Sequence, residues 1–545
     1  MNENEEKFKK IRLTGKKVKS RGILRLIFGR GTIFGVALLL QIYVMLAFLY
    51  QLSDTREIYM LLVFLSLVTV VYIVNTDSNS NFKLAWIIPI LVFPVFGAAF
   101  FLYIHSQLGT IKLRKRAIKI ENLAVSEIKQ EPTAFANMCE KSDGERDLAR
   151  YFWKAGGLPV YENSAVKFFP LGEKKVAQLV KELEKAERFI FLEYFIIAEG
   201  DVWNEVLSVL KQKADEGVEV RILYDGTSSL TCLPLGYFKR LRKMGFQARA
   251  FSPVRPVLTT YQNNRDHRKI VVIDGKTAFT GGVNLADEYA NKIIRFGHWK
   301  DTAVMVKGDA CRNFTYMFLK MWALAGKEDH VKKSEIAQYI NSSQNLLTKK
   351  DRLACMADSK IHSGGFVVPY ADNPYGKERI GKQVYMDILY RAHDYCHIMT
   401  PYLILDDEMI SALRFAAQRG VEVSIIMPHI PDKKMIYSFA RTYYPMLIGY
   451  GVRIFEYMPG FVHAKEFVSD NERAVVGTIN LDYRSLYLHF ENGCYIYSNP
   501  VIADVEKDFQ ETLEYCREIT MENVNDYPKL WLLGAKFLKY LAPLL

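Results

Sequence analysis

The chain has 545 residues, which is enough for two or three domains, and half of its residues are hydrophobic. Its net charge of +12 is unevenly distributed: residues 1–119 carry 17 Lys and Arg against 6 Asp and Glu, and the rest carries 55 against 54. A nucleic-acid enzyme needs a basic surface beside its site to displace counterions. This distribution therefore argues against a nucleic-acid partner and instead puts the excess charge where anionic lipid headgroups would lie.

The seven cysteines are scattered, and no two have CxxC or zinc-ligand spacing. An odd number cannot form a complete disulfide set within one chain. We interpret them as reduced packing residues, which favours a cytosolic environment for the soluble part, and we expect no metal site.

The N-terminal region predicts a membrane anchor. A basic lead, Met1–Gly31, precedes three uncharged apolar runs within a membrane region at residues 32–110, namely Thr32–Leu52, Ile58–Val74 and Leu84–Ile104. Each is close to the ~17–25 residues that a helix needs to cross the ~30 Å hydrocarbon core. The lead is long and no small-residue cleavage site follows the first run, so a cleaved signal peptide is not expected. We predict a multi-pass protein of the cell membrane.

The topology of these runs stays open at this stage. Met1–Gly31 and Lys112–Lys119 are both strongly basic and should both stay cytosolic, yet three full spans would put them on opposite sides. The third run contains Pro89 and Pro94 and could bend or re-enter, and the second run is the shortest. Either run could be the one that fails to span.

From about Glu145 the pattern becomes that of an α/β protein. Short β-branched and aromatic segments predict buried strands, and helical segments alternate with them, which favours a sheet flanked by helices. The predicted strands are Phe189–Ile197, Val218–Tyr224 and Ile270–Ile273, and the predicted helices are Val176–Ala186 and Val202–Glu216.

This part of the chain is also duplicated. The segments 206–225 and 410–428 each read as a helix, a glycine turn and a strand, and Gly-Val-Glu-Val recurs in them. A repeat of about two hundred residues indicates a duplicated domain rather than a solenoid. We expect one domain at residues 145–335, a polar linker at 336–359 and a second domain at 360–545.

Two His-x-Lys-x4-Asp motifs occupy corresponding places in the two halves. In a strand, the His and Lys at positions i and i+2 point to the same face, and the residue between them points away. A Gly-x-x-Asn sequence follows each motif. The candidate site residues are His267, Lys269, Asp274 and Asn284 in the first half, and His463, Lys465, Asp470 and Asn480 in the second.

Two such motifs meeting across a pseudo-twofold axis suit phosphodiester chemistry. The Lys and Asn side chains can hold the non-bridging phosphate oxygens. One imidazole can attack phosphorus while the other protonates the leaving alcohol and deprotonates the incoming one. This chemistry needs neither metal nor cofactor. Asp274 and Asp470 could act directly or could only close a turn.

These motifs, with the sequences around them, resemble the phospholipase D superfamily and, within it, the bacterial cardiolipin synthase family. The segments that carry the resemblance include HRKIVVIDG with GGVNLADEY, HWKDT, TPYLILDDEMISAL and GTINLDYRSLYLHFE, and the likeness covers nearly all of residues 60–545. The resemblance implies two phospholipase D-like domains with mixed sheets, preceded by transmembrane helices. It also implies a reaction in which two phosphatidylglycerol molecules give cardiolipin and glycerol.

The resemblance further implies roles for individual residues. His267 would be the nucleophile and His463 the acid/base, although the reverse stays open, and Glu491 would orient an imidazole. The chain departs from the family pattern at several positions: the usual Ser is Gly282 or Thr478, an Asn is replaced by His489, and Glu466 stands in a strand that is normally apolar.

Functions other than phosphatidyl transfer to a lipid are also considered from the sequence. Water could accept the phosphatidyl group, which would make the chain a hydrolase, and another alcohol could replace phosphatidylglycerol as acceptor. A nuclease is disfavoured by the near-neutral catalytic region, and a scaffold by the completeness of both motifs. The C-terminal segment Trp531–Leu545 mixes large apolar residues with two lysines and could lie on a membrane interface or pack on the second domain.

Overall fold

The computed structural model describes residues 56–545 except 106–107, 126–127, 253–262, 327–332, 341–346, 349–350, 352–354, 356–357, 525 and 545, together with a few isolated residues before 56. Among the latter, β1 (Lys16–Lys17) pairs in parallel with β8 (Ile293–Ile294). The predicted membrane run Thr32–Leu52 therefore falls almost entirely outside the described residues.

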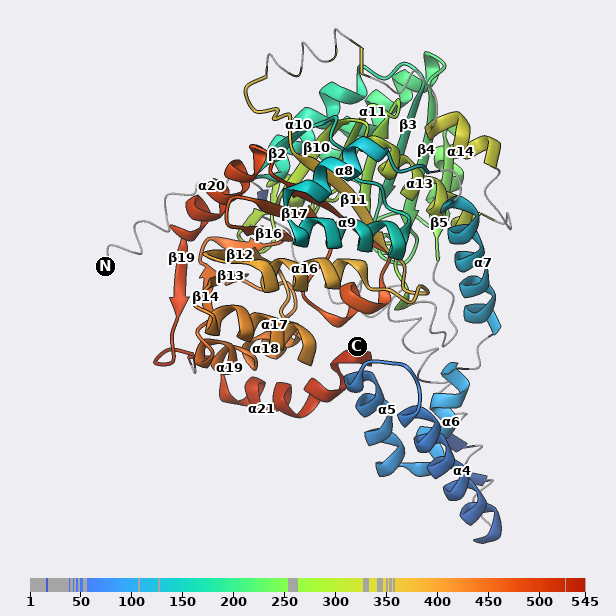
Figure 1. Ribbon diagram of the computed structural model, residues 1–545. Helices are drawn as coiled ribbons and strands as arrows, with labels where there is room; N and C mark the ends of the chain where they lie inside the picture. Colours follow the sequence, from blue (N-terminus) through green and yellow to red (C-terminus); the bar gives the residue numbers. More distant parts are fainter. Residues whose placement is uncertain are drawn as a thin grey trace.

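The second and third apolar runs form three helices that project from the catalytic body (Figure 1). The second run is α4 (Arg56–Val74), a mostly exposed apolar helix long enough to cross a membrane. The third run is not one helix: it breaks at Phe93 into α5 (Ser80–Val92) and α6 (Pro94–His105). A Cβ on Gly97 would stand only 2.7 Å from the backbone of Ile90, so α6 folds back onto α5.

The first half builds a seven-stranded sheet of order β2-β10-β7-β6-β3-β4-β5. Strands β3, β4 and β5 run parallel through helical crossovers, and the other neighbours are antiparallel. The predicted strands and helices named above match β3, β4, β6, α10 and α11, with boundaries that differ by at most four residues. The elements are β2 Ser164–Phe169, α10 Gly172–Leu183, β3 Phe189–Tyr194, α11 Asp201–Asp215, β4 Glu219–Asp225, α12 Tyr237–Lys243, β5 Gln247–Phe251, β6 Lys269–Ile273, β7 Thr277–Gly281, η2 Asp287–Ala290, β9 His298–Lys300, β10 Ala303–Gly308, α13 Cys311–Ala325 and α14 Lys333–Ile340.

The second half repeats this sheet strand for strand and adds β19 at the edge, in the order β11-β18-β17-β16-β12-β13-β14-β19. The duplicated Gly-Val-Glu-Val segments lie at equivalent helix-to-strand turns, where Gly217 and Gly420 both have a φ near +90° that favours glycine. The elements are β11 Phe366–Asp372, α16 Ile380–Arg391, β12 Tyr395–Met399, α17 Asp407–Gln418, β13 Glu422–Pro428, α18 Lys434–Arg441, α19 Tyr444–Gly449, β14 Arg453–Tyr457, β15 Gly460–Val462, β16 Glu466–Ser469, β17 Arg473–Gly477, η4 Arg484–Leu488, β18 Glu491–Tyr497, α20 Val501–Leu513, β19 Cys516–Ile519, α21 Lys529–Leu538 and η5 Lys539–Leu544.

The two sheets share one hydrophobic core, so the halves form a single body. Phe191, Val304 and Val306 of the first sheet lie in the same buried cluster as Val468 and Ile496 of the second. The fold class is thus the expected one: two mixed sheets, flanked by helices and related by a pseudo-twofold axis.

Helices near the start of the predicted first domain pack in a way that chain order does not suggest. The helices between the membrane region and β2 are α7 (Leu108–Val125), α8 (Pro132–Lys141) and α9 (Asp143–Gly156). Leu148 and Phe152 of α9 lie in the core of the second half, together with Tyr385. α9 therefore packs on the second half, although the chain runs from it into β2 of the first half. All seven cysteines are free, as expected.

Candidate active site

The two motifs lie at the junction of the sheets, and backbone pairing across that junction fixes them. The histidines precede the strands: β6 begins at Lys269 and β16 at Glu466. The His267 amide donates to the Phe490 carbonyl at 2.9 Å, and the His463 amide donates to the Lys300 carbonyl at 2.6 Å. Each His is therefore bonded to the residue just before a carboxylate of the opposite half, Glu491 in one case and Asp301 in the other.

Each imidazole consequently pairs with that carboxylate. His267 Nδ1 lies 2.8 Å from a Glu491 carboxylate oxygen, and His463 Nδ1 lies 2.7 Å from Asp301 Oδ2. A proton on Nδ1 donated to the carboxylate leaves Nε2 of each ring free for chemistry. All four side chains are buried. Glu491 was expected from the sequence, but Asp301 was not.

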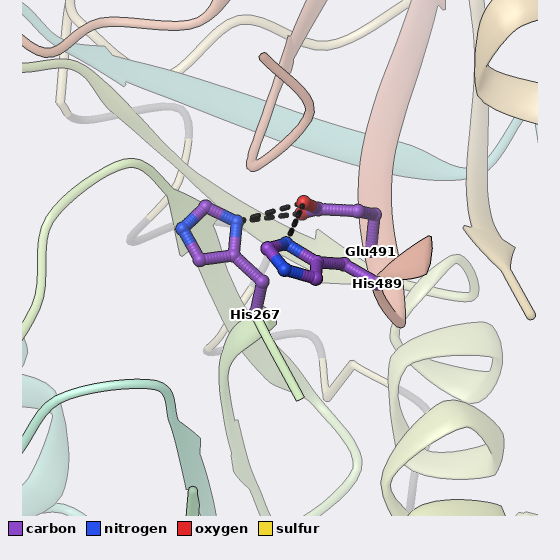
Figure 2. A group of neighbouring side chains, drawn as sticks. All are labelled: His267, His489 and Glu491. Atoms are coloured by element: carbon purple, nitrogen blue, oxygen red, sulfur yellow. Dashed lines mark hydrogen bonds and ion pairs between the residues drawn. The ribbon is translucent and has the colours of Figure 1, made fainter. Parts of the chain in front are cut away.

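Glu491 has further contacts within its own half. Thr478 donates its hydroxyl to Glu491 Oε2, which gives this departure from the usual Ser a role. Figure 2 shows His489 and His267 directed at the same carboxylate, with His489 Nδ1 3.5 Å from Oε1. Ligand atoms of His267, His489 and Glu491 all lie within 4.8 Å of one another, close enough for a metal ion. The 2.8 Å contact is shorter than the roughly 3.4 Å between ligand atoms of tetrahedral zinc, and it suits a shared proton.

The equivalent position in the first half explains Gly282. A Cβ there would stand 2.0 Å from Asp301 Oδ1, so a Ser or Thr would displace the carboxylate that pairs with His463. Gly282 is therefore required by the close approach of Asp301. The hydroxyl found at Thr478 has no equivalent in this half.

The two lysines bring positive charge to the same buried space. Lys269 Nζ donates to the carbonyl of His267 at 2.6 Å, and Lys465 Nζ lies 2.8 Å from His463 Nδ1. Burial lowers the pKa of Lys269 to about 7, with Glu491 opposing the shift and Lys465 adding to it, and burial lowers the pKa of Lys465 to about 8. Because each motif feels the charges of the other, both face one site.

The buried surroundings favour the neutral form of both imidazoles. Burial lowers the pKa of His267 well below its ordinary value, although Glu491 works against this shift. Burial also lowers the pKa of His463, and Lys465 and Lys269 add to the effect. A neutral imidazole is the form that can attack phosphorus or accept a proton.

The two carboxylates differ in their pKa. Burial opposes ionisation of Glu491, but His267 holds its pKa well below the usual range. Burial raises the pKa of Asp301 to about 6, with Lys465 and Lys269 acting against the shift. The pseudo-symmetric site is thus asymmetric in its electrostatics.

The two Asn residues are buried with unsatisfied groups. Asn284 accepts a hydrogen bond from the Ile196 amide at 3.0 Å, and its amide nitrogen has no partner among the described residues. In the same part of the chain Asn480 Oδ1 also lacks a partner, and a flip of its amide would present a donor instead. Such groups can bind a substrate oxygen.

Asp274 and Asp470 contact backbone rather than the imidazoles. Asp274 accepts from the amides of Glu187, Arg188 and Phe189 at 2.7–2.9 Å. Asp470 accepts from the three amides that lead into β12, those of 393–395. Each Asp follows its Lys by five residues, roughly 16 Å along a strand. These contacts hold the neighbouring strand at the end remote from the chemistry.

Glu466, the first residue of β16, lies in a buried polar cluster. Burial, with Asp508 adding to the effect, raises the pKa of Glu466 to about 8, and Lys300 opposes it. Lys300 Nζ itself lies 2.5 Å from Asp508 Oδ2. The cluster adjoins Asp301 through its chain neighbours Lys300 and Thr302.

Comparison with known proteins identifies the family. The model "Cardiolipin synthase, PLD-like domain" matches residues 179–322 and 385–513, and "Phospholipase_D-nuclease N-terminal" matches 64–104. A protein named cardiolipin synthase from Alkalihalophilus pseudofirmus is 34% identical over 85% of this chain and 88% of its own length. The chain belongs to the cardiolipin synthase family of the phospholipase D superfamily.

Two further relatives extend this finding. An uncharacterized protein of Streptococcus mutans is 47% identical over 88% of this chain and 99% of its own length. The crystal structure of phosphatidylserine synthase from Haemophilus influenzae covers 73% of this chain and 99% of its own, with a TM-score of 0.53 at 16% identity, which supports the fold. As a member of its family, the chain is a phosphatidyltransferase.

Proposed function

We propose that the chain makes cardiolipin and glycerol from two phosphatidylglycerol molecules through a covalent phosphohistidine. The observation that carries the proposal is the crossed pairing of the site. Each imidazole bonds through Nδ1 to a carboxylate of the other half, beside two lysines. Apolar helices adjoin this body, which suits a lipid substrate.

In the first step, His267 Nε2 attacks the phosphorus of one phosphatidylglycerol. The bond from phosphorus to the glycerol oxygen breaks. His463, which has taken up a proton on Nε2 beside Asp301 and the bound phosphate, gives that proton to the glycerol oxygen and becomes neutral. Lys269, Lys465 and the amide groups of Asn284 and Asn480 hold the non-bridging oxygens. Ionised Glu491 stabilises the cationic ring of the phosphohistidine.

In the second step, His463 removes the proton from the terminal hydroxyl of a second phosphatidylglycerol. That oxygen attacks phosphorus, the bond to His267 breaks, and cardiolipin forms. Asp301 holds the His463 ring and stabilises its charged form. Asp274 and Asp470 act at a distance, by fixing the strands that carry the motifs.

Product analysis tests the reaction. Protein reconstituted in phosphatidylglycerol vesicles with excess chelator should release one glycerol for each cardiolipin formed. Phosphatidic acid as the sole lipid product would contradict the transferase and favour a hydrolase. If a phospholipid product forms only when another alcohol is added, that alcohol and not phosphatidylglycerol is the acceptor. His267→Ala and His463→Ala should each abolish turnover with the natural substrate.

An activated donor tests which His is the nucleophile. A phosphatidyl ester of nitrophenol needs no acid for its leaving group, so His463→Ala should release about one equivalent of nitrophenolate and stop as a phosphatidyl-enzyme. Peptide mapping should find the adduct on His267, and His267→Ala should show no burst. A burst in His267→Ala with the adduct on His463 would reverse the roles.

We also propose that the membrane region crosses the bilayer twice and re-enters once. α5 and α6 are about 20 and 18 Å long, too short to cross ~30 Å. Both ends of this hairpin lie against the catalytic body: Asn81 Nδ2 donates to Tyr483 at the start of α5, and α7, which follows α6, packs on α13. With Thr32–Leu52 and α4 as the two crossings, both basic segments stay cytosolic.

Fusions to alkaline phosphatase, which folds only in an oxidising compartment, test this topology. A fusion after residue 55, between the two crossings, should be active. Fusions after residue 78 and at the C-terminus should be inactive. Activity of the C-terminal fusion would mean that α5 and α6 together make a third crossing.

A further inference from the structure

The C-terminal helix α21 packs one face on the catalytic body and exposes an apolar face. Ala535 is buried in the core of the second half. Leu530 and Leu533, three residues apart and so on one side of the helix, are 81% and 67% exposed, and Trp531 is 46% exposed. Apolar side chains of this size are rarely left together in water.

Basic residues border this exposed face. Lys529 and Lys536 are exposed and seven residues apart, which puts them in one row beside Leu533. The sequence from Pro528 to Leu545 has three lysines and no acidic residue. An apolar face edged by lysines is typical of a helix that lies in the headgroup layer of an anionic membrane.

The face is continuous with the membrane helices. η5 follows α21 directly and contacts α5. In Figure 1, α21 runs along the edge of the catalytic body nearest α4, α5 and α6. A bilayer that holds these apolar helices would therefore also reach α21.

The same surface leads to the active site. α21 packs against α18. The start of α18 is exposed at Lys434 and Met435, and so is Lys433 just before it. Lys433 is close enough to His463 to lower the pKa of that imidazole, after the larger effects of burial, Lys465 and Lys269. Lipid headgroups bound along this surface would lie near Lys433 and the His463 side of the site.

We infer that α21 and the start of α18 form an interfacial docking surface that lies in the headgroup layer of an anionic leaflet and admits lipid to the site. The inference concerns how substrate arrives and holds for any lipid acceptor. It places the catalytic body flat on the leaflet that α5 and α6 enter.

Fluorescence quenching tests the contact. Wild-type protein and Trp531→Phe are reconstituted in phosphatidylglycerol vesicles with and without brominated acyl chains. The difference between them reports Trp531 and should be quenched, as Trp86 in α5 should be, whereas buried Trp203 should not. A Trp531 signal unaffected by brominated lipid would overturn the inference.

A variant that places acidic residues on this face tests the consequence for catalysis. Leu530→Glu with Leu533→Glu should raise the apparent KM for vesicle phosphatidylglycerol by about tenfold, because two apolar anchors are lost and the new carboxylates repel anionic headgroups. Activity on short-chain, monomeric phosphatidylglycerol should not change. Leu235→Glu, at a similarly exposed Leu remote from α21, is the matched control.

Three results would contradict docking. Equal loss on monomeric substrate would mean that the variant damages the fold or site. Equal loss in Leu235→Glu would mean a general charge effect. A monomeric variant of a dimeric wild type, with Trp531 unquenched, would mean that a second copy of the chain covers the face.

Discussion

Replacing Asp301 by Asn tests the crossed pairing most directly, because it should change activity and stability in opposite directions. Asp301 is fully buried, with Oδ2 2.7 Å from His463 Nδ1. Asn has almost the same shape but carries no charge. The variant therefore removes the electrostatic contribution and leaves the packing nearly intact.

Activity should fall steeply. Without the anion, the charged form of His463 is no longer stabilised, and the amide of Asn can hold the ring in the wrong tautomer. General acid–base catalysis contributes about 10²–10⁴-fold, so kcat for cardiolipin formation should drop by about that factor. KM should change less, because Lys269 and Lys465 remain to bind phosphate.

Stability should rise at neutral pH. The pKa of Asp301 is about 6 in the folded protein against an ordinary 3.8. The unfolded chain therefore loses this proton at a lower pH than the folded protein does. As pH rises from about 4 to about 6, the free energy of unfolding decreases. Two units correspond to about 3 kcal/mol at pH 7, and the penalty is about half as large at pH 5. This is an upper bound, because Asp301 also favours the charged form of Lys465.

Thermal unfolding in detergent at pH 5 and pH 7 checks the expected rise in stability. Glycerol release, measured on the same preparations, checks the expected loss of activity. The Asp301→Asn variant should unfold at a higher temperature than wild type, with the larger gain at pH 7. Asp215→Asn, an exposed Asp on α11, should change neither property. Wild-type kcat in Asp301→Asn would refute the orienting role, and a lower unfolding temperature at pH 7 would refute the electrostatic reasoning.

Three other expectations follow from the same geometry. Gly282→Ala should cut kcat more than about tenfold, because its Cβ would overlap Asp301, whereas Gly449→Ala, with open space around it, should be silent in the same assay. Asp274→Asn should lower stability by about 1–3 kcal/mol in denaturant unfolding while keeping most of kcat, because Asn cannot accept all three backbone amides; a loss of kcat without a loss of stability would contradict this. The profile of kcat/KM against pH should fall below about 6 as Asp301 gains a proton and above about 7 as Lys269 loses one, and Lys269→Arg should move only the alkaline limb upward.

The sequence was enough to predict the duplicated fold, because its signals are local and repeated. Gly217 and Gly420 mark equivalent turns, and the two His-x-Lys motifs lead directly into the equivalent strands β6 and β16. Hydrophobic runs at β3, β4 and β6 are buried on both faces and therefore easy to recognise. Glu491 was also predicted, because it matches an acidic position of the family that the sequence resembles.

Asp301 could not be found by counting residues. It lies seventeen positions after Asn284, whereas Glu491 lies eleven after Asn480, because β8 and β9 follow the short helix η2 in the first half and, in the described part of the chain, have no counterpart after η4. Their equivalence appears only in the strand order, where β10 and β18 take the same place. The pairing of each carboxylate with the opposite half is a long-range contact, which sequence spacing does not record.

Two other features depended on packing. The third apolar run reads as one span because hydropathy does not register the reversal at Phe93, although Pro94 signals a break there. Glu466 reads as an anomaly because its neighbours Lys300 and Asp508 come from distant parts of the chain. In both cases the residue types were recognised in the sequence, but their arrangement depends on tertiary contacts that the sequence does not record.

The asymmetry of the two carboxylates gives a physical reason for assigning different roles to symmetric histidines. A phosphohistidine ring carries positive charge, so the nucleophile needs a partner that stays ionised, and Glu491, with its lowered pKa, fulfils this for His267. The acid/base must gain and lose a proton in each cycle, which a partner with a pKa of about 6 permits without holding His463 permanently charged. The two halves are duplicates, but Gly282 and Thr478 make them unequal. Gly282 leaves room for Asp301 to approach and offers it no hydroxyl group. Thr478 donates its hydroxyl to Glu491 and so favours the ionised carboxylate.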